Sequence, residues 1–290
     1  MKFTLCIPTL NAAREWDEFV RSVRQQSQQP DRVIIIDSES TDGTCERARE
    51  SGFELVRIAR KDFRHGATRQ LAVPLARETD AIVYMTQDAV LADADAFAEL
   101  MQAFADTGIG AAYGRQLPRR GAGPIEAHTR CFNYPATGAV RTMDSVKSLG
   151  FRAIFFSNSF GAYRIEALQS VGGFPLEIEF GEDTVIAARM LVSGWKVAYA
   201  ADARVFHSHG YSMGEEFRRC VEIGRLHAAQ PWLRREFGGA SGEGIRFVRS
   251  QCSHLLRTAP HLIPAALLRS AVKLVGYKQG LRHRNAGSDN

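Results

Sequence analysis

Hydrophobic and polar residues alternate along the first half of this 290-residue chain in two repeating patterns. Short apolar runs, typical of strands buried on both faces of a sheet, cover residues 3–7, 33–36, 55–58, 81–85 and 110–113. Helices are predicted between them, where apolar residues recur three and four positions apart. These helices cover 16–23, 44–50, 67–77 and 97–104. Strands that alternate with helices predict an α/β fold, with a mostly parallel sheet flanked by helices.

The second half of the chain is less regular. The pattern predicts a Gly/Arg/Pro loop at 118–124, extended chain at 154–163, a helix at 182–191 and a strand at 197–206. From about residue 215 onward it predicts helices rich in arginine. We therefore expect one α/β domain over residues 1–214 and a helical, basic C-terminal region over residues 215–290.

Composition excludes several classes of protein. With 45% hydrophobic and 24% charged residues, the chain is neither disordered nor fibrous. The five cysteines are odd in number and never form a C-x-x-C pair, which argues against a disulfide framework or a zinc knuckle. The apolar run at the N-terminus is too short for a signal peptide, and no apolar stretch reaches the roughly 20 residues of a spanning helix. We expect a cytoplasmic protein.

The net charge of +5 gathers near the C-terminus. The basic residues there are Arg257, Arg269, Lys273, Lys278, Arg282 and Arg284, interspersed with leucine, isoleucine and valine. Such a segment suits the anionic inner face of the cell membrane, as a peripheral contact. The alternative is a C-terminal helix packed on the domain. Nucleic acid is not expected, because no aromatic residues or known binding motif accompany the charge.

Polar clusters follow each of the first four predicted strands. They lie at 8–11, 37–44, 62–66 and 86–89. Singly, each is ordinary turn and cap chemistry. Together they lie at one edge of a parallel sheet, beyond the carboxyl ends of the strands, where ligands bind in such folds. The chain lacks G-x-G-x-x-G after its first strand and lacks G-x-x-x-x-G-K-[ST], which argues against a dehydrogenase and a P-loop enzyme.

Several of these segments resemble the family 2 glycosyltransferases, inverting enzymes with the Rossmann-like GT-A fold. The resemblance rests on Cys-Ile-Pro-Thr-Leu-Asn (6–11), Ile-Asp-Ser-Glu-Ser-Thr-Asp-Gly-Thr (36–44), Thr-Gln-Asp-Ala (86–89), Gly-Gly-Phe (172–174) and Gly-Glu-Asp (181–183). Within the family, Phe-Arg-His-Gly-Ala-Thr-Arg (63–69), Phe-Ser-Asn-Ser-Phe (156–160) and His-Ser-His (207–209) resemble bacterial rhamnosyltransferases. Those enzymes use dTDP-rhamnose to build O-antigen or other surface polysaccharides.

The resemblance implies roles for individual residues. The nucleotide of the donor would be bound by Pro8, Thr9, Asn11, Asp37, Arg69 and Gln87. Asp88 would ligate Mg²⁺ or Mn²⁺, which offsets the charge of the departing diphosphate. The family usually has Asp-x-Asp or Asp-Asp at this point, whereas this chain has Gln87-Asp88 and so lacks one carboxylate. His207 would be a further metal ligand, with His209 as the alternative.

Asp183 is the predicted catalytic base, since inversion needs a carboxylate that takes the proton of the acceptor hydroxyl. Asn158 and Glu182 would contact the acceptor or the transferred sugar. Without the resemblance, two acids at 182–183 would be ordinary first-turn residues of a helix. Asp93-Ala94-Asp95 has the letters of a metal-binding D-x-D, but its place before an amphipathic run predicts helix capping instead.

The predicted function is thus transfer of a sugar, rhamnose by resemblance, to a hydroxyl of a polysaccharide or lipid-linked glycan. One alternative is an enzyme of the same family that uses a UDP- or GDP-sugar. The other is a nucleotide-sugar-binding scaffold without catalysis, which the missing carboxylate at Gln87 keeps open.

Overall fold

The computed structural model describes residues 1–239 and 241–282, which form two compact units. Unit 1 comprises Met1–Leu117, Pro135–Asp144 and Ile154–His207. Unit 2 comprises Pro118–Tyr134, Ser145–Ala153 and the described residues from Ser208 on. The boundary expected between 214 and 215 stays a prediction, and the helical unit takes two earlier segments as well. Arg284 lies outside the described residues.

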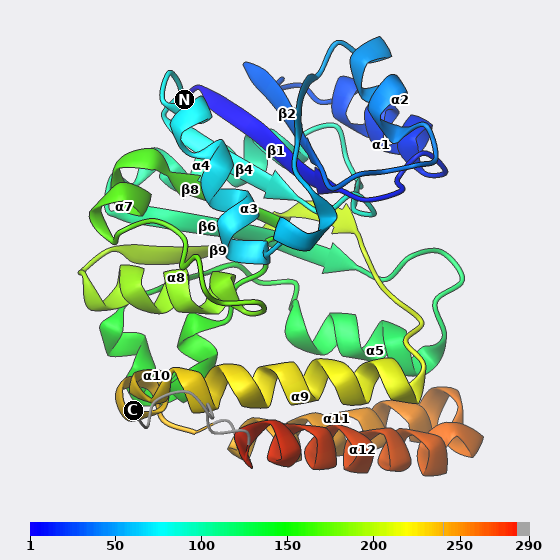
Figure 1. The fold of residues 1–290 in the computed structure, drawn as a ribbon. Coiled ribbons are helices and arrows are strands. Elements are labelled where there is room, and N and C mark those ends of the chain that lie inside the picture. Colours follow the sequence, from blue (N-terminus) through cyan, green and yellow to red (C-terminus); the bar gives the residue numbers. More distant parts are fainter. Residues whose placement is uncertain (240, 283–290) are drawn as a thin grey trace. The chain divides into compact units, whose positions relative to one another are not determined.

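Unit 1 is built on one mixed sheet with the strand order β3-β2-β1-β4-β8-β6-β9-β5, and β7 pairs with β9 (Figure 1). The strands are β1 (Phe3–Thr9), β2 (Arg32–Asp37), β3 (Glu54–Arg57), β4 (Ala81–Met85), β5 (Val90–Leu91), β6 (Ile109–Leu117), β7 (Ala139–Arg141), β8 (Phe160–Arg164) and β9 (Lys196–Phe206). Strands β1 to β4 are mutually parallel, whereas β8 runs antiparallel to both β4 and β6. The predicted α/β fold is confirmed.

Helices pack against the sheet of unit 1, most of them through buried apolar side chains. They are α1 (Trp16–Arg24), α2 (Thr44–Glu50), α3 (His65–Ala72), α4 (Ala96–Gln102), α7 (Ile165–Ser170) and α8 (Glu182–Val192). The core includes aromatic side chains from helix and sheet, such as Phe19, Phe97 and Phe160, all at most 2% exposed. Burial of these rings stabilises the sheet that carries the polar edge.

The structure departs from the predicted elements in a few places. Helix α3 ends at Ala72, before Pro74, which lacks the N–H that a continuing helix needs. The stretch 154–163, expected to be extended, is a strand only from Phe160 onward, and Gly150–Ile154 is a 3₁₀ helix. The short strands β5 and β7 were not predicted, because two or three residues carry no readable periodicity.

Unit 2 is helical, as predicted. Its helices are α5 (Pro124–Asn133), α6 (Val146–Leu149), α9 (Met213–Ala229), α10 (Pro231–Phe237), α11 (Ser241–Thr258) and α12 (Ile263–Arg282). Helices α9 and α12 run side by side (Figure 1). Among the described residues, no helix combines the length and the apolar character that crossing a membrane requires.

Candidate active site

The direction of the strands gathers the predicted site residues of unit 1 at one edge of the sheet. Strands β1, β2 and β4 are parallel, β6 is parallel to β9, and β8 is antiparallel to β4 and β6. The carboxyl ends of β1, β2, β4, β6 and β9 therefore meet at the amino end of β8. Residues at this edge are Pro8, Thr9, Asn11, Asp37, Gln87, Asp88, Asn158 and His207.

Asp37 is fully buried at the end of β2. Its Oδ1 accepts from the backbone N–H of Ser40 at 2.9 Å and from the thiol of Cys45 at 3.1 Å. Its Oδ2 accepts from the hydroxyls of Thr9 and Ser40. Burial acts to raise the pKa of Asp37, but these hydrogen bonds outweigh it and hold the pKa below its usual value. A carboxylate has about four acceptor sites, so a nucleotide base could contact Asp37 only by displacing one of these donors.

Gln87 and Asn11 hold the loop that follows β1 in place through hydrogen bonds. The Oε1 of Gln87 accepts from the backbone N–H of Leu10 at 2.7 Å, and its Nε2 donates to the carbonyl of Leu10 at 3.0 Å. Asn11, which has a left-handed φ of 51°, accepts at its side-chain oxygen from the N–H of Thr41 at 2.9 Å. A carboxylate at position 87 would be unable to donate the second bond to Leu10. Gln87 therefore holds the loop where the family pattern has a carboxylate.

Asp88 and His207 lie together although they are far apart in the sequence. Strand β5 begins two residues after Asp88 and pairs antiparallel with the end of β9, with Val90 opposite Phe206. This pairing places the Oδ2 of Asp88 3.4 Å from the Nε2 of His207. The side chain of His207 is 7% exposed and that of Asp88 is 22% exposed, so the pair is still reachable from solvent through Asp88.

Gln116, at the end of β6, orients the imidazole of His207. The Nδ1 of His207 lies 2.9 Å from the Oε1 of Gln116, while the Nε2 of Gln116 donates to the hydroxyl of Ser157 at 2.9 Å. Because the Oε1 of an amide only accepts, Nδ1 carries the proton and donates it. In the neutral ring, Nε2 then presents its lone pair toward Asp88, as in the ordinary outer-shell arrangement of metal-binding histidines.

These two side chains fit a divalent cation. Two ligand atoms at about 2.0–2.2 Å from an ion and in adjacent positions lie roughly 3 Å apart, close to the 3.4 Å between Asp88 and His207. The donor set of one carboxylate and one imidazole could hold an ion in the part of the chain that is described. His209, the alternative ligand, follows two residues later and belongs to unit 2.

The D-x-D sequence at 93–95 is engaged elsewhere. Both carboxylate oxygens of Asp93 form a bidentate pair with the guanidinium of Arg204, at 2.7 and 2.8 Å. Asp95 accepts from the hydroxyl of Ser27. Helix α4 does begin directly after Asp95, but the Asp95 side chain does not cap it, and the side-chain oxygen of Gln26 accepts from the backbone N–H of Phe97 instead. The expectation that these acids cap the helix is therefore wrong, because Arg204 of β9 and Ser27 after α1 take up their carboxylate oxygens.

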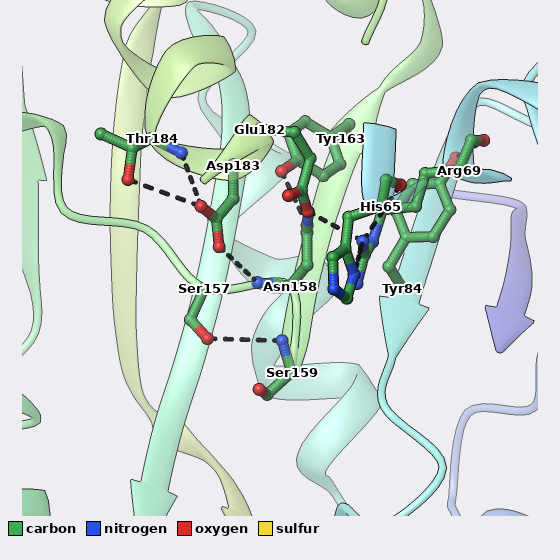
Figure 2. A network of polar contacts seen from close by, with 10 residues as sticks. All are labelled: His65, Arg69, Tyr84, Ser157, Asn158, Ser159, Tyr163, Glu182, Asp183 and Thr184. Carbon is green, nitrogen blue, oxygen red and sulfur yellow. Dashed lines mark hydrogen bonds and ion pairs between the residues drawn. The ribbon is translucent and has the colours of Figure 1, made fainter. Parts of the chain in front are cut away.

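Asp183 lies in the first turn of α8 with its carboxylate turned toward the loop before β8 (Figure 2). Its Oδ1 accepts from the backbone N–H of Thr184 at 2.7 Å, and its Oδ2 accepts from the backbone N–H of Asn158 at a long 3.4 Å. Withdrawal from water and the neighbouring negative charge of Glu182 raise the pKa of Asp183 to about 7. At neutral pH such a group both exists as a carboxylate and binds a proton readily.

Behind Asp183, Glu182 forms a buried ion pair with Arg69 at 2.8 Å, with both side chains at most 5% exposed. Burial acts to raise the pKa of Glu182, but the Arg69 guanidinium outweighs it and holds the pKa below its usual range. Asn158 donates through Nδ2 to Glu182 at 2.9 Å and accepts through Oδ1 from the hydroxyl of Tyr163 at 2.7 Å (Figure 2). The polar ends of Arg69, Glu182 and Asn158 thus contact one another rather than solvent.

A short loop joins the Asp88–His207 pair to Asp183. Ser157 accepts from Gln116, which holds His207, and the next residue, Asn158, donates its backbone N–H to Asp183. The two chemical groups are therefore tied to a common segment in front of β8.

This chain is similar to known proteins over most of its length. The family model for glycosyl transferase family 2 matches residues 4–172. The O-antigen chain rhamnosyltransferase RfbN of Salmonella typhimurium is 45% identical over 281 residues, which are 97% of this chain and 90% of the relative. The O-antigen chain rhamnosyltransferase WbaN of Salmonella anatum is 43% identical over 279 residues, 96% of this chain and 89% of the relative. The chain belongs to glycosyl transferase family 2.

The fold of this glycosyltransferase also matches solved structures. One is the mannosyltransferase PcManGT from Pyrobaculum calidifontis, in complex with GDP-Man and Mn²⁺. The match has a TM-score of 0.61 at 20% identity and covers 94% of this chain and 87% of that one. At this level of identity the similarity concerns the fold alone. The predicted family, the GT-A fold and the class of enzyme, an inverting glycosyltransferase, are confirmed.

The sequence did not single out every residue that shapes the glycosyltransferase site. Gln116 is a buried polar residue at the end of a strand, and that contrast with its apolar neighbours was a usable signal. Tyr163 could not have been found, because its hydroxyl meets Asn158 only once β8 is folded. The hydroxyl of Thr86 is buried without a hydrogen-bond partner, directly before Gln87 and Asp88, and is a further candidate contact for the donor.

Proposed function

We propose that this glycosyltransferase transfers rhamnose from dTDP-rhamnose to a hydroxyl of an O-antigen-type glycan or its lipid-linked precursor. The donor and the product class are supported by the two relatives, both named O-antigen chain rhamnosyltransferases, which match nearly the whole chain. The observation that carries the transfer chemistry is the common loop at 157–158, through which the Asp88–His207 pair and Asp183 are held together.

Asp183 acts as the base. As the acceptor oxygen forms its bond to the anomeric carbon, the hydroxyl proton passes to a carboxylate oxygen of Asp183, and the bond between that carbon and the diphosphate oxygen breaks. The nucleoside diphosphate leaves with the bonding electrons. A base with a pKa of about 7 combines a large ionised fraction with good proton affinity at neutral pH.

Asp88 and His207 would hold Mg²⁺ or Mn²⁺. A bound cation would offset the negative charge that develops on the leaving diphosphate. Gln116 accepts from the Nδ1–H of His207, so the neutral imidazole would offer its Nε2 to the ion, and Gln87 keeps the adjacent loop in place. The carboxylate that the family usually has at position 87 is then not required for catalysis, because the imidazole of His207 would supply the second metal ligand.

The loops after β1 and β2 bind the nucleotide. Pro8, Thr9 and Asn11 line its pocket, while Asp37 keeps the loop 37–40 in shape through its four internal hydrogen bonds. Arg69, Asn158 and Glu182, predicted as ligand contacts, act mainly as a buried support that sets the position and the pKa of Asp183.

The enzyme works as a peripheral protein on the cytoplasmic face of the membrane. Helix α12 supports this location, because one of its faces exposes large apolar side chains to solvent. These are Leu267, Leu268, Leu274 and Val275, which are 45–58% exposed. Lys278 and Arg282 follow on the same helix and would favour an anionic leaflet.

Binding and turnover assays with matched donors test the proposal. We expect dTDP-rhamnose with Mn²⁺ to raise the melting temperature of the protein more than UDP- or GDP-sugars do, because a ligand that binds only the folded state stabilises it. Transfer to a deacylated or lipid-linked O-antigen fragment should follow. If a UDP- or GDP-sugar stabilises the protein more strongly, that nucleotide sugar is the donor and dTDP-rhamnose is not. If the donor binds but is neither hydrolysed nor transferred, the protein is the nucleotide-sugar-binding scaffold.

A further inference from the structure

Unit 2 contains a cavity of about 460 Å³ that the proposed chemistry does not use. Its wall is formed by residues of α5, of α9 and of the start of α12, together with the segment 209–211. All of these lie within unit 2. The charged side chains that line it are Glu126, Arg130, Glu216, Arg219, Arg269 and Lys273.

Positive charge prevails in this cavity. Arg269 and Lys273, one turn apart on α12, share the single carboxylate of Glu216 on α9, at 3.0 and 3.1 Å. Their side chains are 29% and 28% exposed, so both still reach the solvent side. Arg130 enters from α5, and only one further carboxylate, Glu126, lines the cavity. Four cationic side chains thus face two carboxylates, which leaves an excess that suits a dianion.

Arg219 is held in a way that suits an anion. Its guanidinium lies over the ring of Tyr211 at 5.2 Å from the centroid. Its Nη1 also donates to the hydroxyl of Tyr211 at a long 3.4 Å. Stacking on an aromatic ring fixes the plane of a guanidinium, the planar group that matches oxyanions through bidentate hydrogen bonds. Arginine is well matched to phosphate for this reason.

The remaining wall is apolar. Ile125, Ile223 and Leu262 line the same cavity, so a ligand that carries a hydrocarbon chain next to its charged group would be accommodated. Helix α12 contributes Arg269 and Lys273 to the cavity and exposes its leucine-rich face elsewhere on its surface. One helix therefore offers contacts to both parts of such a molecule.

We propose that this cavity binds a phosphate monoester or diphosphate group borne on an apolar chain. This inference rests on the proposed function only in that such a group would be the anionic part of the acceptor. The same chemistry is found in the headgroup of a membrane phosphomonoester lipid. In the sequence, the cavity residue His209 follows the proposed metal ligand His207 by two positions.

The first experiment measures binding of inorganic pyrophosphate to the full-length protein by calorimetry in EDTA, without divalent cations. The test variant combines Arg130→Gln with Arg219→Gln and leaves the Glu216 pairs intact. The control combines Arg249→Gln with Arg257→Gln, which removes two exposed charges of α11 that do not line the cavity. We expect at least about a tenfold loss of affinity in the test variant only, since charge-assisted hydrogen bonds are lost.

The second experiment separates the two sources of the ligand. Phosphatidylcholine vesicles contain either phosphatidate, a monoester, or an equal fraction of phosphatidylglycerol, a diester. Weaker binding of the test variant to phosphatidate vesicles alone identifies a membrane headgroup. Unchanged vesicle binding, with pyrophosphate binding lost, identifies the acceptor.

Equal pyrophosphate affinity in the test and control variants would overturn the proposal, as would loss of that affinity in Asp88→Asn, which would place the anion at the donor site. The titration of dTDP-rhamnose with Mn²⁺ on the same samples tests the proposed function separately. If the donor fails to bind while pyrophosphate binding still depends on Arg130 and Arg219, the donor assignment fails and the cavity assignment stands.

Discussion

Asp183 shows how a single carboxylate is adjusted to its task by its neighbours. A base must be ionised at the working pH and must still bind a proton well. Glu182 and the withdrawal from water raise the pKa of Asp183 to about 7, while Arg69 limits the rise. The sequence predicted Asp183 from a motif, but its pKa depends on the packing of α8 against α3 and the loop before β8, which no motif describes.

The pH dependence of turnover follows from this pKa. The proposed base acts when it is deprotonated, so kcat/KM for the acceptor should rise with pH through about 7 and level off above it. Replacement of Glu182 by Gln removes a negative charge beside Asp183, which should lower its pKa and move the rise to more acidic pH. Rate profiles of wild type and Glu182→Gln, with circular dichroism to verify folding, measure the shift. If the rate rises at the same pH in both proteins, the charge of Glu182 does not set the pKa of Asp183.

Asp183→Asn tests the base itself. The substitution keeps the size of the side chain and removes the proton acceptor, so transfer should fall by about 10²- to 10⁴-fold. Nucleotide affinity should hardly change, because the donor is bound by the loops after β1 and β2. Loss of rate with binding preserved is the signature of an interaction made in the transition state.

A stability measurement on the same variant has a defined sign. The raised pKa means that ionised Asp183 is disfavoured in the folded protein, so stability declines as pH rises from about 4 to 7. Asp183→Asn should therefore raise the melting temperature relative to wild type at pH 8 and hardly at all at pH 4. Equal shifts at both values would contradict the raised pKa.

The proposed metal ligand Asp88 can be tested against Asp93, which belongs to the D-x-D sequence at 93–95. Asp88→Asn should abolish the stabilisation that Mn²⁺ adds to the bound nucleotide, since one carboxylate ligand is removed. Asp93→Asn should leave that stabilisation intact and weaken only the bidentate pair with Arg204. Melting curves with nucleotide, with and without Mn²⁺, provide the comparison. The assignment is reversed if metal dependence disappears in Asp93→Asn and survives in Asp88→Asn.

At the scale of secondary-structure elements, the pattern of apolar residues predicted most strands of the sheet. Long apolar runs such as 3–7 and 81–85 became β1 and β4, and the polar residues after them meet at one edge as expected. Strand β5 was missed, although it is the element that brings Asp88 to His207. The strand-end pattern placed Asp88 at the edge of the sheet, whereas the metal-binding roles of Asp88 and His207 both came from the resemblance and stay predictions.

The close packing of α9 and α12 in unit 2 depends on glycines whose spacing in the sequence could have predicted it. Gly276 and Gly280 lie one turn apart on α12, where it approaches α9 closely; Gly276 faces Phe217 and Gly280 faces Gly224. A Cβ at Gly280 would lie 2.0 Å from the carbonyl oxygen of Val221 and 2.8 Å from the Cα of Gly224. Small residues at such spacing allow two backbones to come together, so they mark the face of α12 that packs on α9.

Gly280→Ala should therefore destabilise the protein, by roughly 1–3 kcal/mol for overpacking a tight contact. The matched control is Gly244→Ala in α11, where an added Cβ meets nothing within 4 Å. There the change should be neutral or stabilising by up to about 1 kcal/mol, because alanine favours helix. Urea unfolding of both variants gives the two free energies, and similar destabilisation in both would refute the close α9–α12 contact.

For the molecule as a whole, the proposed membrane contact concerns a surface that the sequence described by composition only. The leucines and basic residues after residue 255 predicted a membrane-binding segment without saying which side chains pack and which are exposed. The structure separates them, because Ala266, Gly276 and Gly280 are buried while Leu268, Leu274 and Val275 are 53–58% exposed on the same helix. Exposed apolar area of this kind marks a contact surface.

The last prediction concerns that surface. The triple variant Leu268→Ser, Leu274→Ser, Val275→Ser removes apolar side chains from α12 without touching its packed face. Binding to vesicles with anionic lipid should weaken at least about tenfold, since each large apolar group buried in lipid contributes on the order of 1–3 kcal/mol. The control, Leu176→Ser with Val192→Ser, removes apolar side chains of unit 1 that are 56% and 54% exposed. Binding of the wild type should also decline as salt screens the basic residues. If both variants bind vesicles as the wild type does, α12 is not the membrane contact, and its leucine face must be assigned to a protein partner.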